Sequence, residues 1–211
     1  MKYKLIAFDL VGTLTEEDAL YRRIHELKHC KENAKQNVQL YLERKISEKE
    51  LITRNVSYHK GTQIEIMKAE AKKIEFRPGA EELINNLKNK YVLALITSDY
   101  DIAAQFVKEK LGFKYAFGCK EKFDKNKGFE KCSEIIDGKT KLRKLELIAQ
   151  KENIKLSEII YIGNDVNDIF ILEKVSYSIA FNASEEVRET ASTYCDSENM
   201  LDILPVIEKL Q

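Results

Sequence analysis

The 211-residue sequence has no net charge, because 35 Lys and Arg residues balance 35 Asp and Glu residues. A chain without a positive surplus is not expected to attract nucleic acid or anionic membranes. It also lacks any apolar run near the roughly 20 residues that span a bilayer, and no signal peptide precedes its first predicted strand. These absences argue against nucleic-acid and membrane partners and predict a cytoplasmic protein.

Cysteine pairs of the Cys-x-x-Cys type are absent, and the four cysteines are scattered at positions 30, 119, 132 and 195. This spacing favours reduced, partly buried thiols over a disulfide framework or a zinc site. His25, His29 and Cys30 lie close together in the chain, and positions i and i+4 share a helix face. No further ligand pattern lies nearby, and structural zinc sites normally have four ligands. The sequence therefore favours a surface or core-packing role for these three residues.

Proline is missing from Glu16 to Lys73, and Gly61 is the single glycine there. Apolar residues recur at helical spacing, and Ser47 followed by Glu50 forms a capping box that opens a helix. A segment of this length is too long for an ordinary connection between a strand and a helix. We predict about four helices that form a cap domain over residues 16–73, inserted into a core domain made of residues 1–15 and 74–211.

Three short apolar runs, Leu5–Phe8, Val92–Ile96 and Ile159–Ile162, are typical of buried strands. Helical patterns separate these runs, and weaker strand signals occur at 115–117, 177–181 and 193–195. Residues 119–138 are polar and predict a hairpin or an irregular loop. Strands that alternate with helices indicate an α/β fold with a doubly wound parallel sheet.

Polar residues follow each of the three buried strands. Asp9 ends the first, Thr97 the second, and Asn164 and Asp165 the third. The carboxyl ends of parallel strands meet at one edge, where ligands bind. With Lys141 and Asp168, these groups suit a divalent cation that holds a phosphate, because Mg²⁺ prefers carboxylate, water and phosphate oxygens. Asp9 could instead cap the next helix, but the matching strand ends disfavour that simpler role.

These stretches resemble the motifs of the haloacid dehalogenase superfamily and, within it, the phosphoserine phosphatase-like branch. The resemblance covers nearly all of the core, and the predicted helical insertion lies where that family carries its mobile cap. The stretches that carry it are Phe8–Thr15, Ile96–Ser98, Lys141 and Gly163–Asp168, supported by Pro78–Leu83 and Lys110–Phe117.

The resemblance implies a Rossmann-like core and a role for each motif residue. Asp9 would attack phosphorus and form a phosphoaspartate, while Thr97 and Lys141 would hold the transferring group. Asp9, the backbone carbonyl of Val11 and a side chain of Gly163–Asp168 would bind Mg²⁺. Asp168 would orient the metal or its water.

Two positions depart from the family pattern. Val11 stands where these phosphatases carry a second aspartate, which protonates the leaving oxygen and later activates water. Asn164 stands where the phosphoserine branch usually has aspartate. We expect Asp165 to be the metal ligand, with Asn164 as the alternative.

Substrate contacts are predicted for four residues. Thr13 and Ser98 belong to the motifs, and Asp18 and Arg54 fall near positions that grip the amino acid end of the substrate in the phosphoserine branch. Asn55 aligns with the arginine of that branch, however, and both Asp18 and Arg54 could equally be solvated charges on the cap surface.

The sequence therefore predicts an Mg²⁺-dependent phosphohydrolase that acts on a small phosphorylated metabolite through phospho-Asp9. Its activity is expected to be reduced or atypical, because Val11 cannot transfer a proton. The alternative is a non-hydrolytic protein of the same fold that binds a phosphorylated ligand or has a regulatory role.

Overall fold

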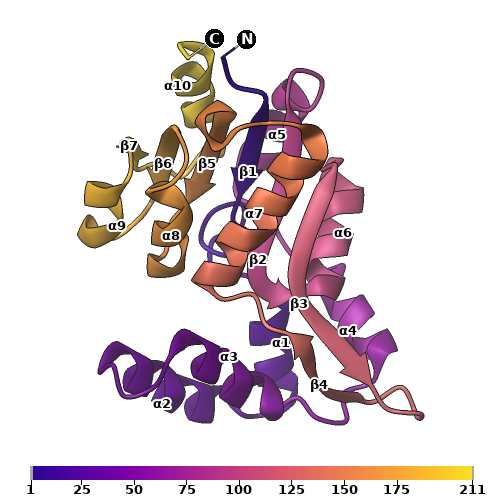
Figure 1. Cartoon of the computed structure of the whole chain (residues 1–211). Coiled ribbons are helices and arrows are strands. Elements are labelled where there is room, and N and C mark those ends of the chain that lie inside the picture. The colour runs from indigo at the N-terminus through magenta and orange to yellow at the C-terminus, as the bar shows by residue number, and fades with distance from the viewer. Residues whose placement is uncertain (1, 211) are drawn as a thin grey trace.

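The computed structural model describes residues 2–210 (Figure 1), and its centre is one seven-stranded sheet in the order β4-β3-β2-β1-β5-β6-β7. Within these residues the pairing of β3 with β4 is antiparallel and the other strand pairings are parallel. The predicted doubly wound α/β sheet is therefore confirmed. The strands are β1 (Leu5–Phe8), β2 (Val92–Tyr100), β3 (Tyr115–Phe123), β4 (Phe129–Glu134), β5 (Ile159–Gly163), β6 (Tyr177–Phe181) and β7 (Thr193–Cys195).

Strand β1 is central and fully buried because each of its four residues is apolar. Its side chains alternate between the two faces of the sheet, as strand geometry requires. Ile6 and Phe8 pack in one hydrophobic cluster, and Leu5 and Ala7 pack in the other. Both faces of the sheet are thus covered, which is the arrangement that parallel sheets need.

Helices cover the two faces in separate groups. The cluster around Phe8 includes side chains of α5 (Ala80–Leu87), α6 (Asp101–Leu111) and α10 (Leu204–Glu208). The cluster around Leu5 includes side chains of α7, α8 and α9, and α7 crosses in front of the sheet in Figure 1. Their bounds are α7 (Gly138–Glu152), α8 (Ile169–Leu172) and α9 (Glu185–Thr190), and short 3₁₀ turns occupy Leu156–Glu158, Val166–Asp168 and Met200–Ile203.

Four helices occur in the segment between β1 and α5. They are α1 (Leu20–Leu27), α2 (Lys31–Leu42), α3 (Glu48–Ser57) and α4 (Ile64–Ala71). In Figure 1, α1, α2 and α3 lie across the end of the sheet toward which the arrows of β1 and β3 point. The predicted capping box forms at α3, where Ser47 and Glu50 exchange hydrogen bonds. Side chains of α1, α3 and α4 pack against Tyr100 at the end of β2 and against α6.

The structure extends two of the predicted strands. Strand β3 continues to Phe123 and pairs with β4, so residues 119–138 contain a regular hairpin. The strand pattern is weak there because Lys120 and Lys122 are exposed and few side chains of the hairpin are buried. Strand β2 continues past Ile96 to Tyr100, which carries its polar end toward α1.

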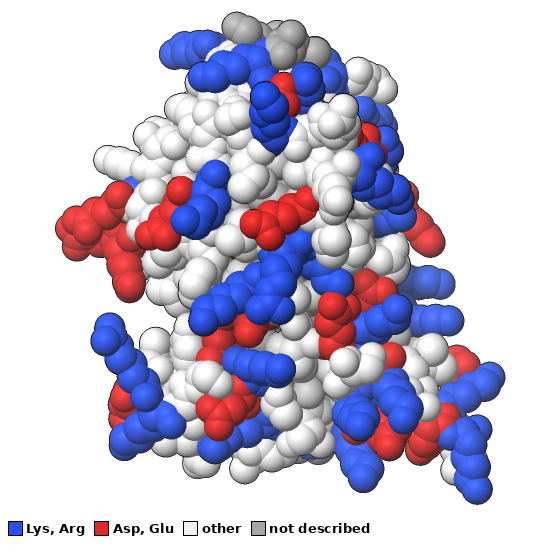
Figure 2. All heavy atoms as spheres, viewed as in Figure 1, with Lys and Arg blue, Asp and Glu red and all other residues white. Residues whose placement is uncertain are grey.

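The surface agrees with the balanced composition. On the face seen in Figure 2, basic and acidic side chains are interspersed. Among the helices of residues 2–210, none has both the length and the apolar character that crossing a bilayer demands. The four cysteines are free thiols, two of them buried, as predicted.

Candidate active site

The register of the central strands brings three polar strand ends together. Phe8 pairs with Leu95 on one side and with Ile162 on the other. Asp9, Thr97 and Asn164 follow these partners within one or two residues, so they meet at one edge of the sheet. All three line a cavity of about 310 Å³. The convergence follows from parallel pairing, which aligns equivalent strand ends.

Lys141, in the first turns of α7, connects three side chains at this edge of the sheet through hydrogen bonds. Its Nζ donates to Asp9 Oδ1 at 2.8 Å, to Asp168 Oδ1 at 2.7 Å and to Asn167 Oδ1 at 2.9 Å. Only 1% of Lys141 is exposed. Because an ammonium group offers three donors, this buried lysine is fully hydrogen-bonded.

Asp168 holds the turn after β5 in shape. Its Oδ2 accepts from the backbone N–H groups of Asn164 (2.9 Å) and Asp165 (3.1 Å), and its Oδ1 accepts from Tyr161 Oη (2.6 Å). The carboxylate thus fixes both the turn and Lys141. The sequence offered no signal for Tyr161, whose hydroxyl reaches the site from within β5.

The electrostatics of this site are dominated by burial. Burial raises the pKa of Asp9 to about 7, an effect opposed by the nearby charge of Lys141 and reinforced by that of Asp168. Burial alone would lower the pKa of Lys141, but the two carboxylates hold it above its ordinary value. Two buried carboxylates therefore face a single buried lysine. When all three are ionised, their net charge is negative, and a bound cation would balance it.

Asn164 and Asp165 differ in their surroundings. The side chain of Asn164 packs against Gly12, and its Oδ1 accepts from Thr13 Oγ1 at 3.1 Å. Asp165 is exposed, and its carboxylate accepts from Val166 N at 2.7 Å, although it also lines the cavity. The amide of Asn164 is thus the group that contacts the loop after β1.

Of the four predicted substrate contacts, Ser98 lines the cavity and the other three do not. Thr13 is buried against Asn164, and Ser98 lines the cavity while its hydroxyl donates to Ile136 O at 2.6 Å. Asp18 instead pairs with Arg23 at 2.6 Å and does not line the cavity that contains Asp9, and Arg54 is exposed on α3. The charges of Asp18 and Arg54 are therefore placed outside the cavity lining.

Two arginines that the sequence did not single out line the cavity. Arg77 donates from Nη2 to Gly12 O at 3.2 Å and lies over the ring of Phe181. Arg22 reaches in from α1 and is half-exposed, with its guanidinium bonded to Glu17 at 2.6 Å. Arg77 precedes the Pro78–Leu83 stretch directly, which is the only sequence signal that could have indicated it.

The helical segment is tied to this site by backbone contacts. Asp99, at the end of β2, accepts from the N–H groups of Leu20 (2.7 Å) and Tyr21 (3.1 Å) at the start of α1. Glu48, in α3, accepts from Gly138 N at 2.9 Å. These contacts hold α1, whose Tyr21 and Arg22 line the cavity, against β2, and they hold α3 against the start of α7.

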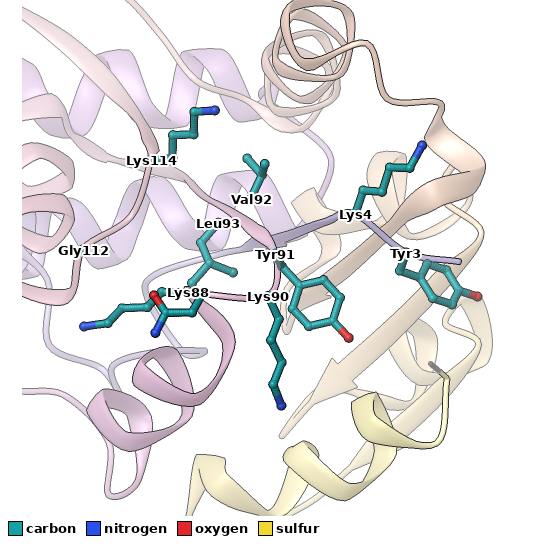
Figure 3. Close-up of a pocket in the computed structure, with 10 residues that line it drawn as sticks. Tyr3, Lys4, Lys88, Lys90, Tyr91, Val92, Leu93, Gly112 and Lys114 are labelled. Atoms are coloured by element: carbon teal, nitrogen blue, oxygen red, sulfur yellow. The ribbon is translucent and has the colours of Figure 1, made fainter. Parts of the chain in front are cut away.

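A different cavity, of about 420 Å³, lies at the opposite end of the sheet, where β1 and β2 begin (Figure 3). Its lysines include Lys4 and Lys114, which pair with Glu158 (2.6 Å) and Glu152 (2.8 Å). Their charge is thereby balanced locally, and the groups suited to chemistry lie at the Asp9 end of the sheet.

The family model of haloacid dehalogenase-like hydrolases matches residues 3–175. The chain belongs to this family, as its motifs predicted. A phosphoserine phosphatase of Methanocaldococcus jannaschii is 32% identical over 98% of this chain and 99% of its own length. These findings place the chain in the phosphoserine phosphatase-like branch, as a hydrolase of the phosphatase type.

Solved structures agree with this assignment. A structure described as a phospho-aspartyl intermediate analogue of phosphoserine phosphatase has a TM-score of 0.86 at 31% identity, and a substrate-bound phosphoserine phosphatase complex has 0.87 at 30%. Each match covers 98% of this chain and 99% of the other.

Proposed function

We propose that this chain is an Mg²⁺-dependent phosphatase that hydrolyses a small phosphomonoester through a phosphoaspartate on Asp9. The observation that carries the proposal is the position of Asp9. Its buried carboxylate follows the central strand, is held by Lys141 Nζ at 2.8 Å, and lines a cavity beside Thr97. The likeness to a phospho-aspartyl intermediate analogue of phosphoserine phosphatase supports the same reading.

The proposed reaction has two steps. First, a carboxylate oxygen of Asp9 bonds to phosphorus, the ester P–O bond breaks, and the leaving oxygen takes a proton. Water then attacks phosphorus, the bond to Asp9 breaks, and inorganic phosphate leaves. Lys141 and the hydroxyl of Thr97 would offset the charge of the transferring group in both steps, which is where phosphoryl transfer gains most from a protein.

The donor set suits Mg²⁺. Two buried carboxylates share one lysine, and the oxygens available near the cavity are those that this ion prefers. We propose Asp9, the carbonyl of Val11 and an oxygen of the turn after β5 as ligands. The contact of Asn164 with Gly12 supports its amide oxygen, with Asp165 as the alternative. Bound Mg²⁺ would neutralise phosphate oxygens, and Asp168 would act by orienting the turn and Lys141.

Val11 makes the proposed activity atypical. Its side chain is half-buried at the cavity and cannot carry a proton. General acid–base help is worth about 10²–10⁴-fold, so we expect slow turnover unless another group acts. Among the other carboxylates that line the same cavity, Glu16 and Glu17 belong to the helical segment and could substitute.

We also propose that residues 16–73 act as the cap that selects the substrate, with residues 1–15 and 74–211 as the core. Arg22 and Tyr21 of α1 line the cavity together with Arg77 of the core. Guanidinium groups bind carboxylate and phosphate oxygens, so the substrate would be a small phosphorylated metabolite with a further anionic or polar group. No nucleic acid or membrane partner is proposed.

The test is phosphate release from a panel of phosphomonoesters, including phosphoserine, with Mg²⁺ and with a chelator. Asp9→Asn should abolish release, whereas Asp202→Asn, an exposed carboxylate far along the chain, should leave it unchanged. Equal release by wild type and Asp9→Asn would refute the phosphoaspartate.

The second candidate, a non-hydrolytic phospho-ligand binding protein, rests on Val11. Its signature would be tight binding of beryllium or aluminium fluoride at Asp9 without turnover of any phosphomonoester. Turnover that depends on Asp9 would exclude it.

A further inference from the structure

We propose that His25, Cys30 and His59 form a zinc site within the helical segment, separate from the proposed magnesium site and independent of the proposed function. His25 lies in the last turn of α1, Cys30 directly before α2, and His59 just after α3. Each is at least nine-tenths buried. Their candidate ligand atoms all lie within 4.8 Å of one another.

The arrangement of donor atoms suits one shared cation. Cys30 Sγ lies 3.7 Å from His25 Nδ1, and His25 Nδ1 is in direct contact with His59 Nε2. Two imidazole nitrogens and one sulfur are a borderline-soft donor set, which favours Zn²⁺ over the hard ions that oxygen sites take. The site therefore differs in chemistry from the oxygen-rich surroundings of Asp9.

A partner outside the donor set orients His59. Its Nδ1 is hydrogen-bonded to the hydroxyl of the buried Tyr100, at the end of β2. A proton on Nδ1 leaves the lone pair on Nε2, which faces His25 and Cys30. Histidine ligands of metals usually hold their second ring nitrogen in this manner.

Side-chain packing alone explains this cluster of His25, Cys30 and His59 less well than metal coordination does. Two imidazoles and a thiol are withdrawn from water, and burying polar groups costs free energy unless new partners replace the solvent. Metal coordination would supply binding free energy to offset such burial, because a structural ion binds the folded chain and not the unfolded one.

Of the three proposed ligands, His25 also lines a cavity of about 540 Å³ beside α1 and α2, together with residues such as Tyr21 and Ala34. Three protein ligands leave one tetrahedral position for a water, which is the pattern of open zinc sites, whereas closed structural sites have four protein ligands.

Zinc binding at these residues would have a structural consequence. The ion would join α1, the start of α2 and the end of α3, and through Tyr100 it would link them to β2. Tyr100 directly follows Asp99, which holds the start of α1. Zinc would thus fix the helices that border the cavity without touching the reacting phosphate. His25, Cys30 and His59 are positioning residues in this role.

The experiment is titration of metal-free, reduced protein with Co²⁺ in excess Mg²⁺, followed by Zn²⁺ competition. We expect one equivalent of Co²⁺ to give a thiolate-to-cobalt charge-transfer band, and Zn²⁺ to abolish it. Cys30→Ser should remove the band, and His59→Gln should weaken or remove it. The matched controls are Cys195→Ser and His29→Gln, since His29 is exposed and is the one histidine of the three outside the cluster.

Two further variants keep the proposal falsifiable. Tyr100→Phe retains the ring but loses the hydroxyl, and it should weaken metal affinity by about 10–100-fold. Asp9→Asn should leave the cobalt band intact, so failure of the proposed phosphatase activity would not affect this result. If wild type gives no thiolate band, or if Cys30→Ser binds Zn²⁺ with unchanged affinity and stabilisation, the zinc site is refuted.

Discussion

The side chain of Asn164 occupies the space that a Cβ atom on Gly12 would need. Such an atom would lie 2.0 Å from Asn164 Nδ2, and Gly12 has a φ of +88°. The loop after β1 and the turn after β5 therefore approach each other as closely as a glycine permits. This contact brings the Val11–Gly12 loop next to an amide that is a candidate metal ligand.

Gly12→Ala should disrupt the active site and lower stability. The added methyl would collide with Asn164, and φ +88° is unfavourable for alanine, so we expect a loss of about 1–3 kcal/mol and a large fall in phosphate release. Gly61→Ala is a matched control, because Gly61 has a φ of +82° with nothing within 4 Å of its Cβ position. It should show the backbone cost alone and full activity. Urea unfolding and phosphate release measure both, and equal effects of the two variants would contradict the collision.

Val11→Asp should restore the proton carrier that the site lacks. We expect the rate of phosphate release to rise by about 10²–10⁴-fold, with little change in stability because Val11 is only half-buried. Val11→Asn has nearly the same shape but cannot transfer a proton, so its rate should remain near that of wild type. No increase in Val11→Asp would indicate that Glu16 or Glu17 already supplies the proton.

Lys141→Met should be strongly destabilising and inactive. It would leave Asp9 and Asp168 buried without their shared cation, and removing one partner of a buried ion pair costs about 3–5 kcal/mol. Lys144→Met is the control on the same helix, because Lys144 pairs with the half-exposed Glu134 and such pairs contribute about 0–1 kcal/mol. Similar losses of unfolding free energy in both variants would show that Lys141 does not stabilise the buried carboxylates of Asp9 and Asp168.

Glu121→Gln should stabilise the protein in a pH-dependent manner. Burial raises the pKa of Glu121 from 4.5 to about 7, while its carboxylate accepts from Ile102 N at 2.9 Å. The folded state thus binds the proton more tightly than the unfolded chain. The contribution of Glu121 to stability is present below about pH 4.5 and is lost as pH rises through about 7.

Glutamine is neutral throughout this range and keeps the acceptor oxygen. At pH 8 the Glu121→Gln variant should therefore exceed wild type by about 1–2 kcal/mol in unfolding free energy, and near pH 4 the two should agree. The control is Glu109→Gln, an exposed residue on α6. Its difference from wild type should not change with pH. A constant difference for Glu121→Gln would mean that burial does not shift the titration of this residue.

Local patterns in the sequence were sufficient to predict much of the fold. Four consecutive apolar residues followed by a turn signal predict β1, because a central parallel strand is buried on both faces. The capping box at Ser47 formed as predicted, since it depends on residues three positions apart. The hairpin of β3 and β4 was less visible, because half-exposed polar strands lack the apolar alternation that marks a strand.

The sequence by itself determined that Asp9, Thr97 and Asn164 lie at or near the carboxyl ends of parallel strands, and parallel pairing then brings them together. The motifs also predicted Lys141 and Asp168 at this site. Only the tertiary structure decided that Lys141 bonds to Asp9 and Asp168 at once, and that Arg77 reaches Gly12. It likewise replaced His29 with His59 beside His25 and Cys30, although 34 residues separate the two histidines. Sequence periodicity reports which face of a helix or strand is buried, whereas contacts between distant residues depend on strand register and helix packing.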